Sequence, residues 1–213
     1  DHWIIRQINH AATDIEKYLE KYQFSEAADV IYHMIWDDLA DWYIEASKTS
    51  INRPLLSWAL ATSLQLAHPF APFVTETIWQ TLNYTTGILM ADHWPPPEQY
   101  DEIAAESFER IKELVSEGRW VISELPGNER YDLLFANDSL IENNQETIKH
   151  LMRLKSIKKI DQPRGLRLAA VNREAWLDID SETLYQHQSN LELRLVNARK
   201  RKDNLVARLE NTN

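Results

Sequence analysis

Two groups of basic residues carry the clearest chemical signal in this sequence. The first group has Asp161 as its only acidic neighbour and consists of Lys149, Arg153, Lys155, Lys158, Lys159, Arg164 and Arg167. The second group is the run Arg199, Lys200, Arg201 and Lys202. Because dense positive charge attracts phosphate, both groups are candidate contacts for a nucleic-acid backbone. The alternative is an ordinary solvated surface, since charged residues also flank most coiled coils.

The acidic side chains that could bind a metal ion fit an ordinary solvated surface better. Asp37, Asp41 and Glu45 share one helical face at a spacing that could hold Mg²⁺ or Ca²⁺. A solvated or arginine-paired row of carboxylates has the same spacing. Asp178 and Asp180 fit surface and helix-capping positions. We therefore predict no metal site.

Histidine and tryptophan are the remaining candidates for chemistry. His68 has no carboxylate or nucleophile at a spacing typical of general base catalysis, so we interpret it as the residue that ends a helix. Tryptophan can stack on bases, but Trp42, Trp58 and Trp79 lie on or beside apolar stripes. We therefore predict that these three side chains pack in a core, and we predict no catalytic residue.

Composition removes several classes of function. Without cysteine, the chain can have no disulfide, thiolate nucleophile or cysteine-bound zinc. Its four glycines are scattered, which excludes a glycine-rich phosphate loop. No run approaches about 18 apolar residues, so we expect a soluble, cytoplasmic protein with no membrane partner. The first residues, DHWIIRQI, are typical of a helix interior, so we expect the chain to begin partway through a larger protein.

The net charge of −10 conceals an asymmetry along the chain. Residues 1–148 contain 9 Lys and Arg against 25 Asp and Glu, whereas residues 149–213 contain 14 against 8. The basic part would attract phosphate and the acidic part would repel it. This division is typical of an interaction surface confined to one region.

The first third of the chain predicts helices. The expected core-facing positions of three helices recur every three or four residues: Ile4, Ile8, Ala11, Ile15, Leu19 and Tyr22; Ala28, Ile31, Ile35, Leu39, Trp42 and Ala46; and Leu56, Ala59, Leu60, Leu64 and Ala67. Ser25 is the predicted N-cap of the second helix, with Phe24 packed beside it. Asn52, Arg53 and Pro54 are expected to separate the second helix from the third.

A tight corner follows the third helix. Pro69 disfavours helical geometry at His68, and Pro72 suits the first turn of a fourth helix. Phe70 and Phe73 are expected to fill the corner. The core face of the fourth helix is expected at Val74, Ile78 and Leu82, with Trp79 beside it.

The remaining sequence predicts a small α+β module and a long helix. A helix is expected to run to about residue 124 and another to cover residues 141–154. Strands are expected at residues 131–135, 156–160, 166–171 and 176–179, with turns at 126–128, 163–165 and 172–173. From Ser181 onwards, Leu184, Leu191, Ala198 and Leu205 recur every seven residues, interleaved with Gln188, Leu195, Lys202 and Leu209. This seam is typical of a coiled coil, whose partner would be the module, another chain or a second helix.

The residue sequence of the corner is more specific than its packing role requires. HPFAPFVTETIWQ resembles the HPF-x-PF-[VI]-TE-x-[IL]-W signature in the anticodon-binding helical domain of class I tRNA synthetases for valine, isoleucine and leucine. The resemblance extends through WIIRQIN, YQFSEAADVIYHMIWDDLADWYIE, NRPLLSWALATSLQLAHPF and ADHWP, so it covers residues 1–95 in order. WLDIDSETLYQHQSNLELRL and NLVARLENTN resemble, more loosely, the start of the coiled-coil arm that ends valyl-tRNA synthetases, with residues 210–213 as its Asn-rich corner.

The resemblance implies a mainly α, C-terminal part of a valyl-tRNA synthetase. Its expected domains are an antiparallel helical bundle at 1–95, a proline-rich linker at 96–102, a small α+β module at 103–180 and the first helix of a tRNA-binding arm at 181–213. Arg6 and Arg53 are the expected anticodon contacts in the bundle, and the alternative for each is an ion pair with a carboxylate. The two basic groups are the expected backbone contacts. Partners would be a valine tRNA and upstream catalytic and editing domains.

No catalytic role is expected for the chain itself. The family forms an aminoacyl-adenylate from ATP at HIGH and KMSKS motifs, and neither motif occurs here. No cofactor is therefore expected in this part. The alternatives are the same part of an isoleucyl- or leucyl-tRNA synthetase, or a helical protein-interaction module with no RNA role.

Overall fold

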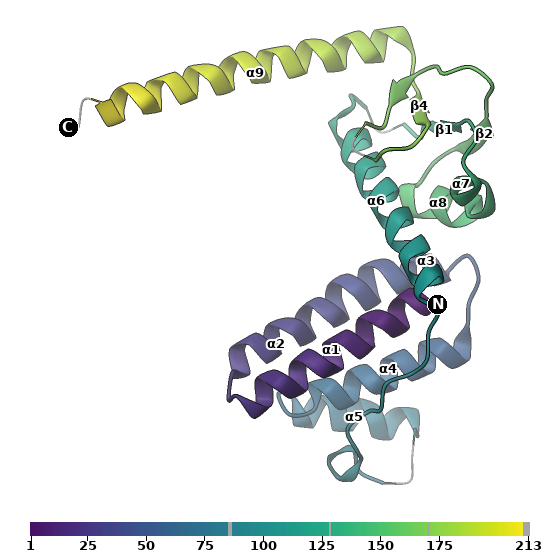
Figure 1. Cartoon of the computed structure of the whole chain (residues 1–213), viewed down its shortest axis with the longest axis vertical. Coiled ribbons are helices and arrows are strands. Elements are labelled where there is room, and N and C mark those ends of the chain that lie inside the picture. The colour runs from purple at the N-terminus through teal and green to yellow at the C-terminus, as the bar shows by residue number, and fades with distance from the viewer. Residues whose placement is uncertain (85–86, 128, 170, 211–213) are drawn as a thin grey trace. The chain divides into compact units, whose positions relative to one another are not determined.

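The computed structural model describes residues 1–84, 87–127, 129–169 and 171–210, and the predicted mainly α fold with a small α+β part is confirmed (Figure 1). Asn128, Ala170 and the Asn-rich corner at 211–213 lie outside the described residues. The contacts divide the chain into unit 1, residues 1–112, and unit 2, residues 113–213. This division differs from the expected domain limits at residues 95, 102 and 180, which stay predictions.

Unit 1 is a bundle of helices. Its elements are α1 (His2–Glu20), α2 (Phe24–His33), the π-helical η1 (Met34–Ile44), α3 (Glu45–Ser47), α4 (Arg53–Ala67), α5 (Pro72–Leu82) and the 3₁₀ turn η2 (Leu89–Ala91). The first half of α6 (Glu102–Glu124) also packs here, because Ala105 and Phe108 join the core of the bundle. Asn52 caps α4 by accepting a hydrogen bond from the Leu55 amide.

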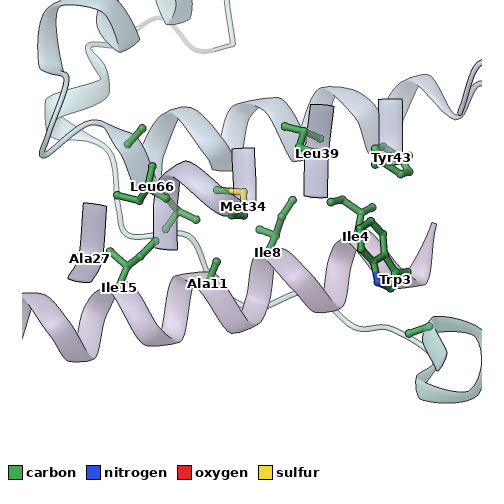
Figure 2. Close-up of a cluster of buried hydrophobic side chains, with 14 residues drawn as sticks. Trp3, Ile4, Ile8, Ala11, Ile15, Ala27, Met34, Leu39, Tyr43 and Leu66 are labelled. Carbon is green, nitrogen blue, oxygen red and sulfur yellow. The ribbon is translucent and has the colours of Figure 1, made fainter. Parts of the chain in front are cut away.

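The core of the bundle follows the predicted stripe of α1. Ile4, Ile8 and Ile15 are fully buried and point toward α2, η1 and α4, as Figure 2 shows. Helix α1 ends at Glu20, so the expected core position Tyr22 lies outside it and is 81% exposed. The predicted Ser25 cap is wrong, because α2 begins at Phe24 and its N-cap residue is Gln23.

A π-helical segment changes which side chains of the second helix are buried. From Met34 to Ile44 the wider turn moves the buried face to Met34, Leu39 and Tyr43. Ile35 and Trp42, which a regular α-helical period places in the core, are only partly buried. The wider turn therefore makes the set of buried side chains in η1 different from the predicted set.

The corner between α4 and α5 is a packed turn, but different side chains pack it. Helix α4 ends at Ala67 and α5 begins at Pro72, as predicted. Thr75 and Trp79 form the buried face of α5, and Thr75 Oγ1 lies 2.8 Å from Nδ1 of His68. The expected filling of the corner by Phe73 is wrong, because this ring is 89% exposed.

The expected core stripe of α5 is also wrong. Val74, Ile78 and Leu82 are 56%, 37% and 45% exposed. Helix α5 is apolar on several sides, so its period alone could not identify the side that faces α4. The side that faces α4 is the one that carries Trp79, which packs with Leu64 and Leu89.

Unit 2 contains a mixed four-stranded sheet. The strands are β1 (Asp132–Phe135), β2 (Ser156–Lys159), β3 (Leu166–Arg167) and β4 (Ala175–Asp178), in the order β2-β1-β4-β3. Strand β1 pairs in parallel with β2 and antiparallel with β4. Helices α7 (Ser139–Asn143) and α8 (Gln145–Met152) connect β1 to β2, and α9 (Ser181–Glu210) follows β4. Because β1 lies between two strands and is covered on both faces, Leu133, Leu134 and Phe135 are all buried.

Gly165 allows the chain to approach β4 before β3 begins. Its φ is +86°, and a Cβ atom there would lie 2.2 Å from the carbonyl oxygen of Leu177. Gly165→Ala is expected to lower the free energy of unfolding by about 1–3 kcal/mol, because the backbone would be strained and the new methyl group would clash. Urea unfolding of the variant followed by circular dichroism measures this loss. Gly127→Ala is the matched control, since Gly127 has a φ of +95° but no atom within 4 Å of the added Cβ.

Candidate nucleic-acid interface

The first basic group is divided between the two edges of the sheet. Lys158 and Lys159 lie on β2 at one edge, whereas Arg167 lies on β3 at the other edge. Strands β1 and β4 separate these edges, which places them roughly 14 Å apart at the usual strand spacing. Residues that are close in sequence therefore form two surfaces rather than one patch.

At the β2 edge, the two strand lysines already have acidic partners. Nζ of Lys158 donates to Oδ2 of Asp132 at 2.6 Å, and Nζ of Lys159 lies 3.3 Å from Oε1 of Glu142. The hydrogen bond from Lys158 holds the pKa of Asp132 below its usual value, with a further lowering by the hydroxyl of Ser156. These lysines would have to exchange a carboxylate for a phosphate in order to bind RNA.

Arg153 and Lys155 are the available cations at this edge. Arg153 ends α8 in the left-handed conformation with φ 55°, and Lys155 immediately precedes β2. Both side chains are exposed and neither forms an ion pair within the described ranges, although the charge of Lys155 contributes to the lowered pKa of Asp132. Lys149, on α8, is partly buried.

The β3 edge repeats this pattern with arginine. Nη2 of Arg164 donates to Oδ2 of Asp178 at 2.9 Å. Arg167 is exposed and has no acidic partner in the part of the chain that the structure describes.

The second basic group lies on α9, where consecutive residues point in different directions. Successive positions differ by about 100° around a helix, so Arg199 to Lys202 surround most of its circumference. Lys202 lies in the heptad seam and, with Arg201, lines a groove along α9 that includes Ala198 and Leu205. Arg199, Lys200 and Arg201 lie outside the seam positions. Arg199 and Lys200 do not line the groove, whereas Arg201 borders the seam.

The start of α9 is fixed by Asp180, as its predicted helix-capping position indicated. The Asp180 carboxylate accepts hydrogen bonds from the amide and the hydroxyl of Thr183, both at 2.8 Å. These bonds lower the pKa of Asp180, so the cap is retained until acid protonates the carboxylate. Further along, Leu184, Leu191 and Leu205 are 39%, 41% and 59% exposed, so the seam is open among the described side chains. The expected seam residue Leu209 lies outside the described side chains.

In unit 1, the structure distinguishes the two expected anticodon contacts. The side chain of Arg6 is only 13% exposed and forms ion pairs with Glu102 and Glu109 at 2.9 Å and 3.3 Å. It joins α1 to α6, so we remove it from the candidate RNA contacts. Arg53 is exposed at the first position of α4 and has no acidic partner in the described residues.

The side chains considered for other chemistry have local partners. Oδ2 of Asp37 lies 2.7 Å from Nδ1 of His33, and Glu45 pairs with Lys48. Among tryptophans, Trp79 is 3% exposed, which confirms its core position. Trp42 and Trp58 are partly buried against the core of the bundle.

One aromatic surface was missed by the sequence interpretation. Tyr32 and Trp36 are stacked with their ring centroids 6.4 Å apart, and each is 58% exposed. Their spacing of four residues, away from the predicted apolar stripe, was the available signal.

No helix in the described part of the chain is long and apolar enough to cross a membrane.

Comparison with known proteins gives a consistent set of similarities. A family model for the anticodon-binding domain of tRNA ligase matches residues 1–168. The chain is 36% identical to a valine–tRNA ligase of Geobacillus kaustophilus over 137 residues, which cover 59% of the chain and 16% of that protein. It is 32% identical to a valine–tRNA ligase of Petrotoga mobilis over 211 residues, which cover 85% of the chain and 24% of that protein. The chain thus spans about a sixth to a quarter of the length of these relatives.

Proposed function

This chain belongs to the family of anticodon-binding domains of tRNA ligases, and from that premise we propose that it binds a valine tRNA as part of a valine–tRNA ligase. Unit 1 would hold the anticodon, and the basic surfaces of unit 2 would hold the tRNA backbone. The names of its relatives support valine over isoleucine or leucine. In such a ligase, ATP-dependent aminoacylation would take place in other domains in the cytoplasm, and this part would need no cofactor.

The proposed contacts with the tRNA backbone are supported by a set of cations that form no ion pair in the described residues. In unit 2 the exposed cations that form no ion pair among the described residues include Arg130, Arg153, Lys155, Arg167, Arg199, Lys200, Arg201 and Lys202. A cation without a carboxylate partner can bind phosphate without first breaking an ion pair. Unit 1, by contrast, has 7 Lys and Arg against 17 Asp and Glu, so its contacts must avoid phosphates.

Reversal of the available pair at the β2 edge tests this division. Arg153→Glu with Lys155→Glu is expected to flatten the log–log salt dependence of tRNA binding by about 1.4–1.8, because each phosphate contact contributes about 0.7–0.9. Filter binding at several salt concentrations gives the slope. The loss is expected to be equal for cognate and non-cognate tRNA, since phosphates carry no sequence information.

Reversal of the neighbouring pair is the matched control. Lys158→Glu with Lys159→Glu changes the net charge equally, but it also places new carboxylates beside Asp132 and Glu142. We expect a smaller change in slope and a lower thermal midpoint. An unchanged slope in the Arg153 and Lys155 variant would argue against a backbone contact at this edge. Unchanged binding in both variants would favour a protein-interaction module.

A further inference from the structure

The Tyr32–Trp36 pair is a preformed stacking surface on unit 1. The two ring planes differ by only 8°, and both rings are exposed although most large aromatic side chains of the bundle face its core. Tyr32 lies near the end of α2 and Trp36 lies in η1, so the change to π-helical geometry occurs between them. A parallel pair that already faces solvent can extend its stack over a third planar ring without rearrangement.

Polar acceptors border this surface. The ring of His33 meets the ring of Tyr32 edge-on, with centroids 5.4 Å apart. Nδ1 of His33 lies 2.7 Å from Oδ2 of Asp37, and both side chains are more than half exposed. When Nδ1 carries the proton and donates it to Asp37, Nε2 of His33 is left as an acceptor. Oδ1 of Asp37 has no hydrogen-bond partner among the described residues, so it is a second acceptor.

The charge around this surface selects the part of a nucleotide that can approach it. Between Lys21 and Lys48 the chain has no lysine or arginine but has six Asp and Glu, and Lys112, which pairs with Asp38 of this segment, is only 16% exposed. Such a surface repels phosphate and favours a neutral ring with hydrogen-bond donors on its edge. A nucleotide would therefore approach with its base toward the protein and its phosphate away from it.

We propose that Tyr32, His33, Trp36 and Asp37 hold one unstacked anticodon-loop base that carries an exocyclic amino group, which is adenine, cytosine or guanine. This inference rests on the proposed function and specifies which residues of unit 1 recognise a base. The base extends the Tyr32–Trp36 stack, and its amino group donates to Oδ1 of Asp37, as amino groups of bases do to carboxylates elsewhere.

Binding of a synthetic valine anticodon stem–loop to the 213-residue chain tests the stacking step. Trp36→Ala and Tyr32→Ala are each expected to weaken binding about 5- to 150-fold, the range for one base stacked on an aromatic ring. The salt slope should stay unchanged, because no phosphate contact is lost. Trp36→Phe and Tyr32→Phe should retain most of the affinity. Phe73→Ala is the matched control, since it removes an exposed ring from α5 without a parallel neighbour.

Base substitution tests the hydrogen bond. Asp37→Asn should weaken binding to the native stem–loop. The same substitution should have no effect on one RNA in which a single adenine, cytosine or guanine of the loop is replaced by uracil. That loss of effect would identify the base that Asp37 recognises. An effect of Asp37→Asn that persists on every substituted RNA would overturn the assigned hydrogen bond.

The outcomes distinguish this inference from the proposed function. If Trp36→Ala binds as wild type while Arg153→Glu with Lys155→Glu still flattens the slope, the stacking surface is refuted and tRNA binding stands. If the wild-type chain binds no tRNA at all, the proposed function fails and the inference with it. If Trp36→Ala leaves RNA affinity intact but changes the sedimentation of the chain, the surface contacts protein rather than RNA, which also overturns the inference.

Discussion

Trp79→Ala is expected to lower the free energy of unfolding of unit 1 by about 3–5 kcal/mol, the cost of removing a large buried side chain. Trp79 is 3% exposed and joins α5 to α4 and η2 through Leu64 and Leu89. Its ring also lies 5.0 Å from that of Tyr84 between centroids. Few other side chains hold α5 in place, because the rest of its apolar surface is exposed.

Calorimetry of the chain measures this loss as a fall in the thermal midpoint of more than about 10 °C. Trp36→Ala is the control, because it removes the same side chain from the surface of the same unit. We expect the control to change the midpoint by no more than a few degrees. A Trp79→Ala midpoint within a degree or two of the wild type would remove Trp79 from the core.

Reversal of the three α9 cations outside the seam, Arg199, Lys200 and Arg201, to glutamate is expected to weaken tRNA binding about 100-fold at 0.15 M salt. Three lost phosphate contacts also flatten the salt slope by about 2.1–2.7. The variant should keep its helix content, since these residues have no acidic partners among the described ones. Filter binding and circular dichroism measure the two quantities.

The control reverses three cations of unit 1, Lys17, Lys21 and Arg110, the last of which pairs with Glu106 on the same helix. It changes the net charge of the chain equally, but these residues lie in the acidic unit. We expect a clearly smaller change in slope than for the α9 variant. Equal slopes in the two variants would mean that net charge, rather than a surface on α9, determines the affinity.

The sequence predicted helix positions well where one apolar stripe was unambiguous. The stripe of α1 and the corner between Ala67 and Pro72 are where the pattern put them. The pattern failed on α5, because several faces of that helix are apolar and only packing with Leu64 selects the Trp79 face. It also failed in η1, since no period of 3.6 residues describes a π-helical turn.

The sequence predicted which residues belong to the candidate site, but it did not predict how they are arranged in space. The sequence identified the basic residues, yet it could not show that β1 and β4 divide the first group between two edges of the sheet. Nor could it separate Arg153 from Lys158, because the pairing of Lys158 with Asp132 depends on the register of β1 and β2. Sequence position alone likewise gave no indication that Arg6 is enclosed by two carboxylates of α6.

Recognition of a valine anticodon by this chain, as we propose, is tested most directly by one measurement. The affinity of the chain is measured for a valine tRNA and for the same tRNA with its anticodon exchanged for another. We predict an affinity at least about tenfold lower for the exchanged tRNA, because base contacts in unit 1 are lost, with the same salt slope, because the backbone contacts of unit 2 are kept. Equal affinities for the two tRNAs would contradict anticodon recognition by this chain.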